Sequence, residues 1–182
     1  MPDSVYPAFG SPQRLVLYVL REWFKDTDYG LHIATLMPND FDGRLPFVLV
    51  RSNQRTGNEG VRSADERFMR TVSIGIETIT TGLNAENDGY ELQESCRLAL
   101  LWAQREQLTI PGVGSIASFI RSNDISRVSD YATSTGVVQY ASLPKGAVRH
   151  EAIYQMMMRP PLGGASNKYL PSFVREGLAH GV

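Results

Sequence analysis

The sequence predicts an α+β fold of two layers, a mostly antiparallel or mixed β-sheet with two main helices packed on one face. The main evidence lies in residues 68–108, where the period of the apolar side chains changes from two to about 3.6. The alternating residues are Val72, Ile74 and Ile76, and the helically spaced ones are Leu98, Leu101 and Trp102, with Ala99, Leu100 and Ala103 beside them. This segment predicts a strand with one buried face, followed by an amphipathic helix that lies on the sheet.

Both helices have recognisable start signals. Ser11 and Pro12 fit the N-cap and first position of a helix that ends between about Asp26 and Gly30. Its apolar stripe consists of Leu15, Val19, Leu20, Trp23 and Phe24. For the second helix, Asp88 and Glu91 have the spacing of a capping box, which predicts its first turn there.

Four further segments predict strands. Residues 31–37 precede Pro38, and residues 47–50 are apolar on both faces, as expected of a strand that is covered on both sides. Residues 115–121 form the next strand, and residues 147–158 alternate between a buried and a wet face. Short β-like pieces, including residues 137–140, are expected in between. The predicted order is helix, strand, strand, strand, helix, strand, strand.

The predicted organisation is one domain with loose ends. Residues 1–11 form an extended arm, residues 12–160 the α+β domain, and residues 161–182 a tail. The tail is rich in glycine but also carries Tyr169, Leu170, Phe173, Val174 and Leu178, so we expect it to dock on its own domain or on a neighbour. Residues 51–67 predict a long polar loop, and loops beyond about 12–15 residues are usually functional or disordered.

Composition excludes some classes of function. The formal net charge of the 182 residues is -1, which gives no overall basic field to hold nucleic acid or an anionic membrane. The single cysteine, Cys96, has no partner for a disulfide and is expected to be a buried small hydrophobe. No signal peptide and no run of 18 apolar residues is present, so a cytoplasmic protein is expected.

No motif of known chemistry is present in the sequence. His32, His150 and His180 have no neighbours at metal-ligand spacing, and no nucleophile elbow or phosphate-binding glycine loop occurs. His150 falls on the apolar face of its strand, where a core or interface role is expected. In Met156–Met158 the middle residue points away from the other two, so core packing is expected there. The sequence therefore predicts no catalytic, cofactor or metal site, and a protein that is not an enzyme.

The order of the elements carries a resemblance. The matching pieces are, in order, the helix LVLYVLREWF, Met37-Pro38-Asn39, the strand of residues 46–51, a polar arginine-containing loop, Asp65 before the strand of residues 72–79, the helix DGYELQESCRLALLWA and the strand YQMMMRP. Over about residues 12–160 this arrangement resembles the tail terminator proteins of long-tailed (siphovirus) phages, of the actinobacteriophage type. The region of residues 122–146 and the tail after Pro161 depart from the family and carry nothing over from it.

The resemblance implies a structural virion protein at the junction of tail and neck. Such a protein forms a hexameric ring on the major tail tube protein, ends tube polymerisation and joins the tail to the head connector or stopper, while DNA passes through the ring without specific binding. The alternatives are another neck or tail component, such as a connector, stopper or tube subunit, or, from a different class, a small enzyme or ligand-binding module.

In the expected ring, two sets of residues are candidates for contacts. Candidates for the interface with another subunit or partner are Arg51, Arg55, Glu59, Arg62, Asp65, Arg67, Tyr169 and Phe173. A simple solvated loop is an equally good interpretation of the charged residues among them. Candidates that face the lumen of the ring are Thr71, Ser73 and Glu77, on the polar side of their strand.

Overall fold

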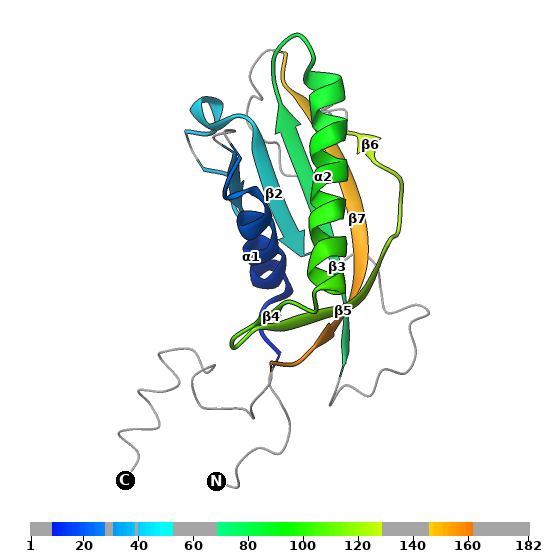
Figure 1. The fold of residues 1–182 in the computed structure, drawn as a ribbon. Helices are drawn as coiled ribbons and strands as arrows, with labels where there is room; N and C mark the ends of the chain where they lie inside the picture. The colour runs from blue at the N-terminus through cyan, green and yellow to red at the C-terminus, as the bar shows by residue number, and fades with distance from the viewer. Residues whose placement is uncertain (1–8, 28–30, 39, 53–68, 129–145, 162–182) are drawn as a thin grey trace, which may run out of the picture.

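One mixed sheet of seven strands forms the back of the protein, and both long helices cover the same face of it (Figure 1). The structure, a computed structural model, describes residues 9–27, 31–38, 40–52, 69–128 and 146–161, and these statements apply to them. The predicted α+β fold, with helices packed on one face of a mostly antiparallel sheet, is confirmed.

The order of strands in the sheet is β1-β2-β3-β7-β5-β4, and the short β6 pairs with β7 beyond the end of β5. The strands are β1 (His32–Ala34), β2 (Phe47–Ser52), β3 (Arg70–Thr80), β4 (Thr109–Ile110), β5 (Gly114–Arg121), β6 (Ser126–Arg127) and β7 (Val148–Arg159). Every described pair is antiparallel except β1 with β2, which is parallel. The two longest strands, β3 and β7, are paired along their whole length at the centre of the sheet.

The first two strands differ in part from the prediction. The strand expected over residues 31–37 is shorter, with only His32–Ala34 in β1. In β2 the expected burial on both faces is confirmed, because Val48 and Val50 join the core under the helices while Phe47 and Leu49 pack on the opposite face. A 3₁₀ turn, η1 (Phe41–Arg44), precedes β2.

The prediction that β3 is buried on one face only was wrong for most of its length. Ile74 and Ile76 lie under the helices as expected, but every residue from Ile74 to Thr80 is buried. On the helix-free face, Ile79 packs with Phe47 and Leu49, and Glu77 is held by arginines. Polar residues in a strand therefore did not mark a face that is open to water.

The first helix, α1 (Pro12–Phe24), begins as the sequence predicts. The Arg14 N–H donates to the Ser11 side-chain oxygen (3.4 Å), and Pro12 occupies the first position, where a missing N–H costs nothing. Leu15, Val19 and Leu20 are buried as expected, together with Val16, whereas Trp23 at the end of the stripe is partly exposed.

The second helix, α2 (Ala85–Arg105), begins earlier than predicted, and only part of its predicted apolar stripe is buried. Its N-cap is Asn84, so the predicted capping box at Asp88 and Glu91 was wrong and both residues lie within the helix. Ala99, Leu100 and Ala103 are buried as predicted, but Leu98 and Leu101 are exposed. Most residues of the face on the sheet are small: Ala85, Gly89, Cys96, Ala99 and Ala103, with the larger Gln93 and Leu100 among them. Small side chains let the helix axis approach the sheet closely, which explains the choice of face.

The contact between α2 and the sheet is closest at Gly89. A Cβ atom at this position would lie 2.5 Å from His150 Nδ1 and 2.9 Å from Thr80 Oγ1, which leaves room only for glycine. Nearby, the side-chain amide of Gln93 donates to the carbonyl oxygens of Ile76 (2.6 Å) and His150 (3.1 Å). These bonds tie the helix to β3 and β7 together.

The alternation predicted for β7 is confirmed on its buried side. His150, Ala152, Tyr154, Met156 and Met158 are all buried under the helices. The predicted core packing of Met156 and Met158, with Met157 on the other face, is likewise confirmed. The predicted arm (apart from residues 9–11), most of the polar loop, the piece at residues 137–140 and the tail from residue 162 lie outside the described residues.

Candidate functional site

A groove of 710 Å³ lies between the outer side of α2 and the end of β5. Tyr90, Leu101, Phe119 and Ile120 supply its apolar surface, and all but Phe119 are largely exposed. The polar lining residues are Glu94, Arg97, Gln104, Arg121, Ser122, Asn123 and Asp124. This mixture of exposed apolar side chains with charged ones distinguishes the groove as a candidate binding site.

A β-bulge in β5 decides which of its side chains lie on the side of α2. The register of β5 against β7 shifts between Ile116 and Ser118, so that Phe119 and Arg121, rather than Ser118 and Ile120, lie on the side of α2. Phe119 then packs edge-on against Tyr154, with ring centroids 6.0 Å apart. Ile120 also lines the groove, but it is on the other side of β5 and stays 64% exposed.

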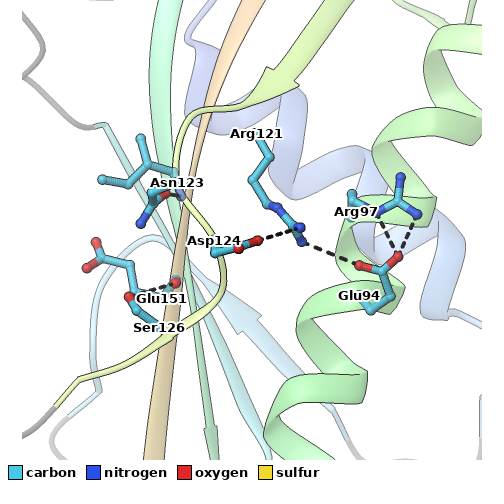
Figure 2. A network of polar contacts seen from close by, with 8 residues as sticks. Glu94, Arg97, Arg121, Asn123, Asp124, Ser126 and Glu151 are labelled. Atoms are coloured by element: carbon cyan, nitrogen blue, oxygen red, sulfur yellow. Dashed lines mark hydrogen bonds and ion pairs between the residues drawn. The ribbon is translucent and has the colours of Figure 1, made fainter.

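Four charged side chains form a continuous chain of ion pairs along the groove (Figure 2). Arg97 donates to Glu94 through Nε (2.7 Å), and Arg121 Nη1 lies 3.6 Å from the second oxygen of Glu94. Arg121 Nη2 also donates to Asp124 (2.9 Å), beyond the end of β5. The chain holds two positive and two negative charges, so the groove is neutral as a whole but locally polar.

The ion pairs also set the protonation of the groove. The hydrogen bond from Arg97 lowers the pKa of Glu94 below its usual range, and the same bond raises the pKa of Arg97. Both residues therefore stay charged throughout the neutral range. Asp124, at the mouth of the groove, has a side chain that is 91% exposed.

Beneath the groove lies Tyr154, which is fully buried on β7 opposite Arg121. Burial raises the pKa of its hydroxyl far above the usual value, so the group is a neutral donor. In the described structure neither Tyr154 Oη nor Arg121 Nη1 makes a hydrogen bond, although both atoms are buried. Arg121 Nη1 faces the carboxylate of Glu94 at 3.6 Å, and Tyr154 Oη is the buried polar atom without an acceptor beneath the groove.

A second polar cluster lies on the helix-free face of the sheet. Glu77 is 2% exposed, and its two carboxylate oxygens lie 3.0 Å from Arg51 Nε and 3.3 Å from Arg149 Nε. Glu77 is also opposite Glu151 in the register of β3 and β7. Like charges at facing positions repel, and the two arginines offset this repulsion at Glu77.

The sequence-predicted site residues fall in different places. Arg51 is paired with Glu77 within the chain, and Thr71, Ser73 and Glu77 lie together on the helix-free face of β3. Glu77 is buried within the chain between its arginine partners, and the expected role of Thr71, Ser73 and Glu77 in the lumen of a ring stays a prediction. The remaining candidates, Arg55, Glu59, Arg62, Asp65, Arg67, Tyr169 and Phe173, lie outside the described residues, so their interface role stays a prediction.

Sequence reasoning missed the groove. Glu94 with Arg97 and Arg121 with Asp124 are each three residues apart, a spacing that signals local ion pairs. The link between the two pairs depends on the bulge in β5 and on the packing of α2, neither of which the spacing shows. His150 is buried as expected, with Nε2 3.5 Å from Glu86. Burial also raises the pKa of the Cys96 thiol, as expected of an inert core residue.

Comparison with known proteins does not identify the family of this chain. No protein-family model matches the chain, and no curated protein matches it. Among the described residues, no group of three or more His, Cys, Asp or Glu is placed to hold a metal ion. None of the helices described is long and apolar enough to cross a membrane.

Proposed function

We propose that this protein is a structural subunit of a phage virion, which assembles with copies of itself into a ring on the end of the tail tube. The ring ends tube polymerisation and supplies the surface to which the head connector or stopper binds. The tube protein and the connector are the expected partners, and DNA passes through the ring without being bound specifically. No reaction is assigned to the chain.

The observation that carries the proposal is the order of the elements. The resemblance to tail terminators rests on a helix, a short strand, a second strand, a polar segment, a long strand, a long helix and a closing strand. The chain has α1, β1, β2, the segment of residues 53–68, β3, α2 and, at the end, β7 in this order. The strands β4, β5 and β6 follow α2 in the chain, and β3 and β7 pair directly with each other.

The outer surface of the helices supports an assembling protein. Tyr18 and Trp23 of α1 and Leu98 and Leu101 of α2 are exposed large apolar residues on the helix layer. Trp23 is held in place by a hydrogen bond from Nε1 to the Ser95 hydroxyl (3.3 Å) and by the ring of Trp102, 5.7 Å away. Oriented aromatic residues on a surface are typical of subunit interfaces.

Electron cryomicroscopy of the neck of virions that carry this chain tests the proposal. We expect a closed ring of identical copies between the last ring of tube protein and the connector. The same map separates the alternatives, because a tube subunit would repeat along the tail and a connector or stopper would contact the portal side. A single copy at the neck, or an open filament of copies, contradicts the proposal.

A further inference from the structure

Residues 122–128, which continue from the end of β5 through β6, lie along the edge of β7 that faces away from β3. We propose that this segment is an edge strap, which detaches from β7 while the rest of the fold stays intact, and whose detachment is controlled by ionic strength. This inference goes beyond the proposed assembly, since it concerns the fold of a single chain.

The edge strap covers a part of β7 that β5 does not reach. The pairing of β5 with β7 ends at Tyr154, and β6 adds two pairs, at His150 and Glu151. Between these pairs a side chain takes the place of a strand, because the Ile153 N–H donates to Asn123 Oδ1 (2.7 Å). The strap therefore stands in for a regular strand at this edge of the sheet.

Little apolar surface holds the strap in place. Ile125 is its one side chain that packs against the main hydrophobic core, and it is only partly buried. Both residues of β6, Ser126 and Arg127, are exposed. Segments with few buried apolar contacts open at a lower free energy than core strands do. The strap is therefore expected to open before the sheet does.

Two ion pairs connect the ends of the strap to α2. At one end, Arg127 Nη1 lies 3.0 Å from Glu86 Oε2. At the other end, Arg121 Nη1 lies 3.6 Å from Glu94 Oε2, one residue before the strap begins (Figure 2). Glu86 and Glu94 are about two turns apart on α2, so one helix holds the strap at two points. All four side chains are at least 27% exposed, so dissolved salt screens both attractions.

Detachment of the strap uncovers the backbone of β7 from Arg149 to Ile153. An unpaired strand edge is a template for pairing with another chain, which is why proteins cover such edges. The strap therefore decides when this edge of the sheet is open.

Hydrogen exchange of the full chain, resolved to single amides by mass spectrometry, tests the inference. Three backbone N–H groups form the hydrogen bonds between strap and β7 and so report on detachment: Ser122 to Ile153 O (2.7 Å), Val128 to Arg149 O (2.9 Å) and Ile153 to Asn123 Oδ1. We expect these three strap amides to exchange about a hundredfold or more faster than the amides of Ile74 and Ile76, at the centre of the sheet.

Low concentrations of urea show whether the opening is local. Detachment of the strap exposes little surface, so the exchange of the strap amides is expected to stay nearly constant. The exchange of the Ile74 and Ile76 amides is expected to rise steeply, because it requires the sheet to unfold. Raising the NaCl concentration from about 0.05 M to about 1 M is expected to accelerate the strap amides by about three- to tenfold.

Variants show whether the ion pairs control the opening. Glu86→Gln changes an exposed side chain and is expected to accelerate the strap amides by about threefold in dilute salt and to reduce their response to NaCl. Arg127→Gln removes the other partner and should have the same effect. The matched control is Asp40→Asn, which breaks an exposed ion pair with Arg44 in the segment before β2 and leaves the strap amides unchanged.

Three results would overturn the inference. The first is strap amides that exchange as slowly as those of Ile74 and Ile76 and with the same dependence on urea, which means that the strap opens only with the sheet. The second is exchange of the strap amides that neither NaCl nor Glu86→Gln accelerates. The third is an equal effect of Glu86→Gln and Asp40→Asn on the strap amides.

Discussion

The replacement Glu77→Gln removes the negative charge from the cluster on the helix-free face while keeping the size of the side chain. At an effective dielectric constant of about 20, each of the two ion pairs at 3.0 Å and 3.3 Å contributes roughly 5 kcal/mol before desolvation. Desolvation of the ions offsets much of this attraction, and removing one partner of a buried pair typically costs about 3–5 kcal/mol. The Arg51 side chain is 38% exposed, so solvent screens its attraction to Glu77. We therefore expect Glu77→Gln to lower the free energy of unfolding by about 3 kcal/mol.

Equilibrium unfolding in urea measures this loss. The fluorescence of Trp23 and Trp102 follows the packing of the helix layer, and far-ultraviolet circular dichroism follows the secondary structure as a whole, so coincident transitions indicate a two-state process. Glu77→Gln is expected to shift the midpoint to lower urea with an unchanged slope. The slope matters because a change in it would indicate a different denatured or native state.

Glu86→Gln is the matched control. Glu86 also faces two basic side chains, Arg127 Nη1 at 3.0 Å and His150 Nε2 at 3.5 Å, but it is 54% exposed. We expect a loss of less than about 1 kcal/mol, as is usual for pairs at the surface. Equal effects of the two substitutions, or a loss below about 1 kcal/mol for Glu77→Gln, would refute the argument that burial makes the Glu77 cluster important.

Three further predictions follow from the helix layer. Gly89→Ala is expected to destabilise the protein by about 1–2 kcal/mol, because the new Cβ would lie 2.5 Å from His150 Nδ1. This loss is expected even though alanine is the better helix former by about 1 kcal/mol. A rise in the urea midpoint would contradict the close packing at Gly89. The buried thiol of Cys96, whose pKa is raised, is expected to react with DTNB only as fast as the protein unfolds, and rapid labelling of native protein would refute its burial. The pKa of Glu94 is lowered in the folded state by Arg97, so its stabilisation is present above the unfolded-state pKa and is lost as the pH falls through the folded-state pKa. The stability difference between wild type and Glu94→Gln, under about 1 kcal/mol for this partly exposed pair, should therefore shrink between about pH 6 and about pH 3, and a constant difference would count against the pair.

Most of the fold class was predictable because its signals are local. The Ser11–Pro12 start of α1 depends on backbone groups within one turn, and the alternation in β7 depends on the geometry of a single strand. The apolar run of β2 likewise needs only that both faces of a strand be covered. The buried face of α2 was harder to predict, because large apolar residues such as Leu98 and Leu101 outweigh small ones in any count of hydrophobicity. The face on the sheet instead consists mostly of small residues, which permit close approach, with Leu100 as its one large apolar side chain.

The candidate site could not be predicted from the sequence, because it also depends on contacts between distant segments. Simple alternation from Ile116 would place Ile120 inside and Arg121 outside, and the bulge in β5 reverses both. The burial of Glu77 depends on arginines from β2 and β7, which are distant in the sequence. The sequence by itself determined the elements and their order, since propensity, capping and periodicity act over a few residues. Only the tertiary structure decided which polar groups are buried and which apolar ones stay outside, because those outcomes depend on register and on partners that pairing brings together.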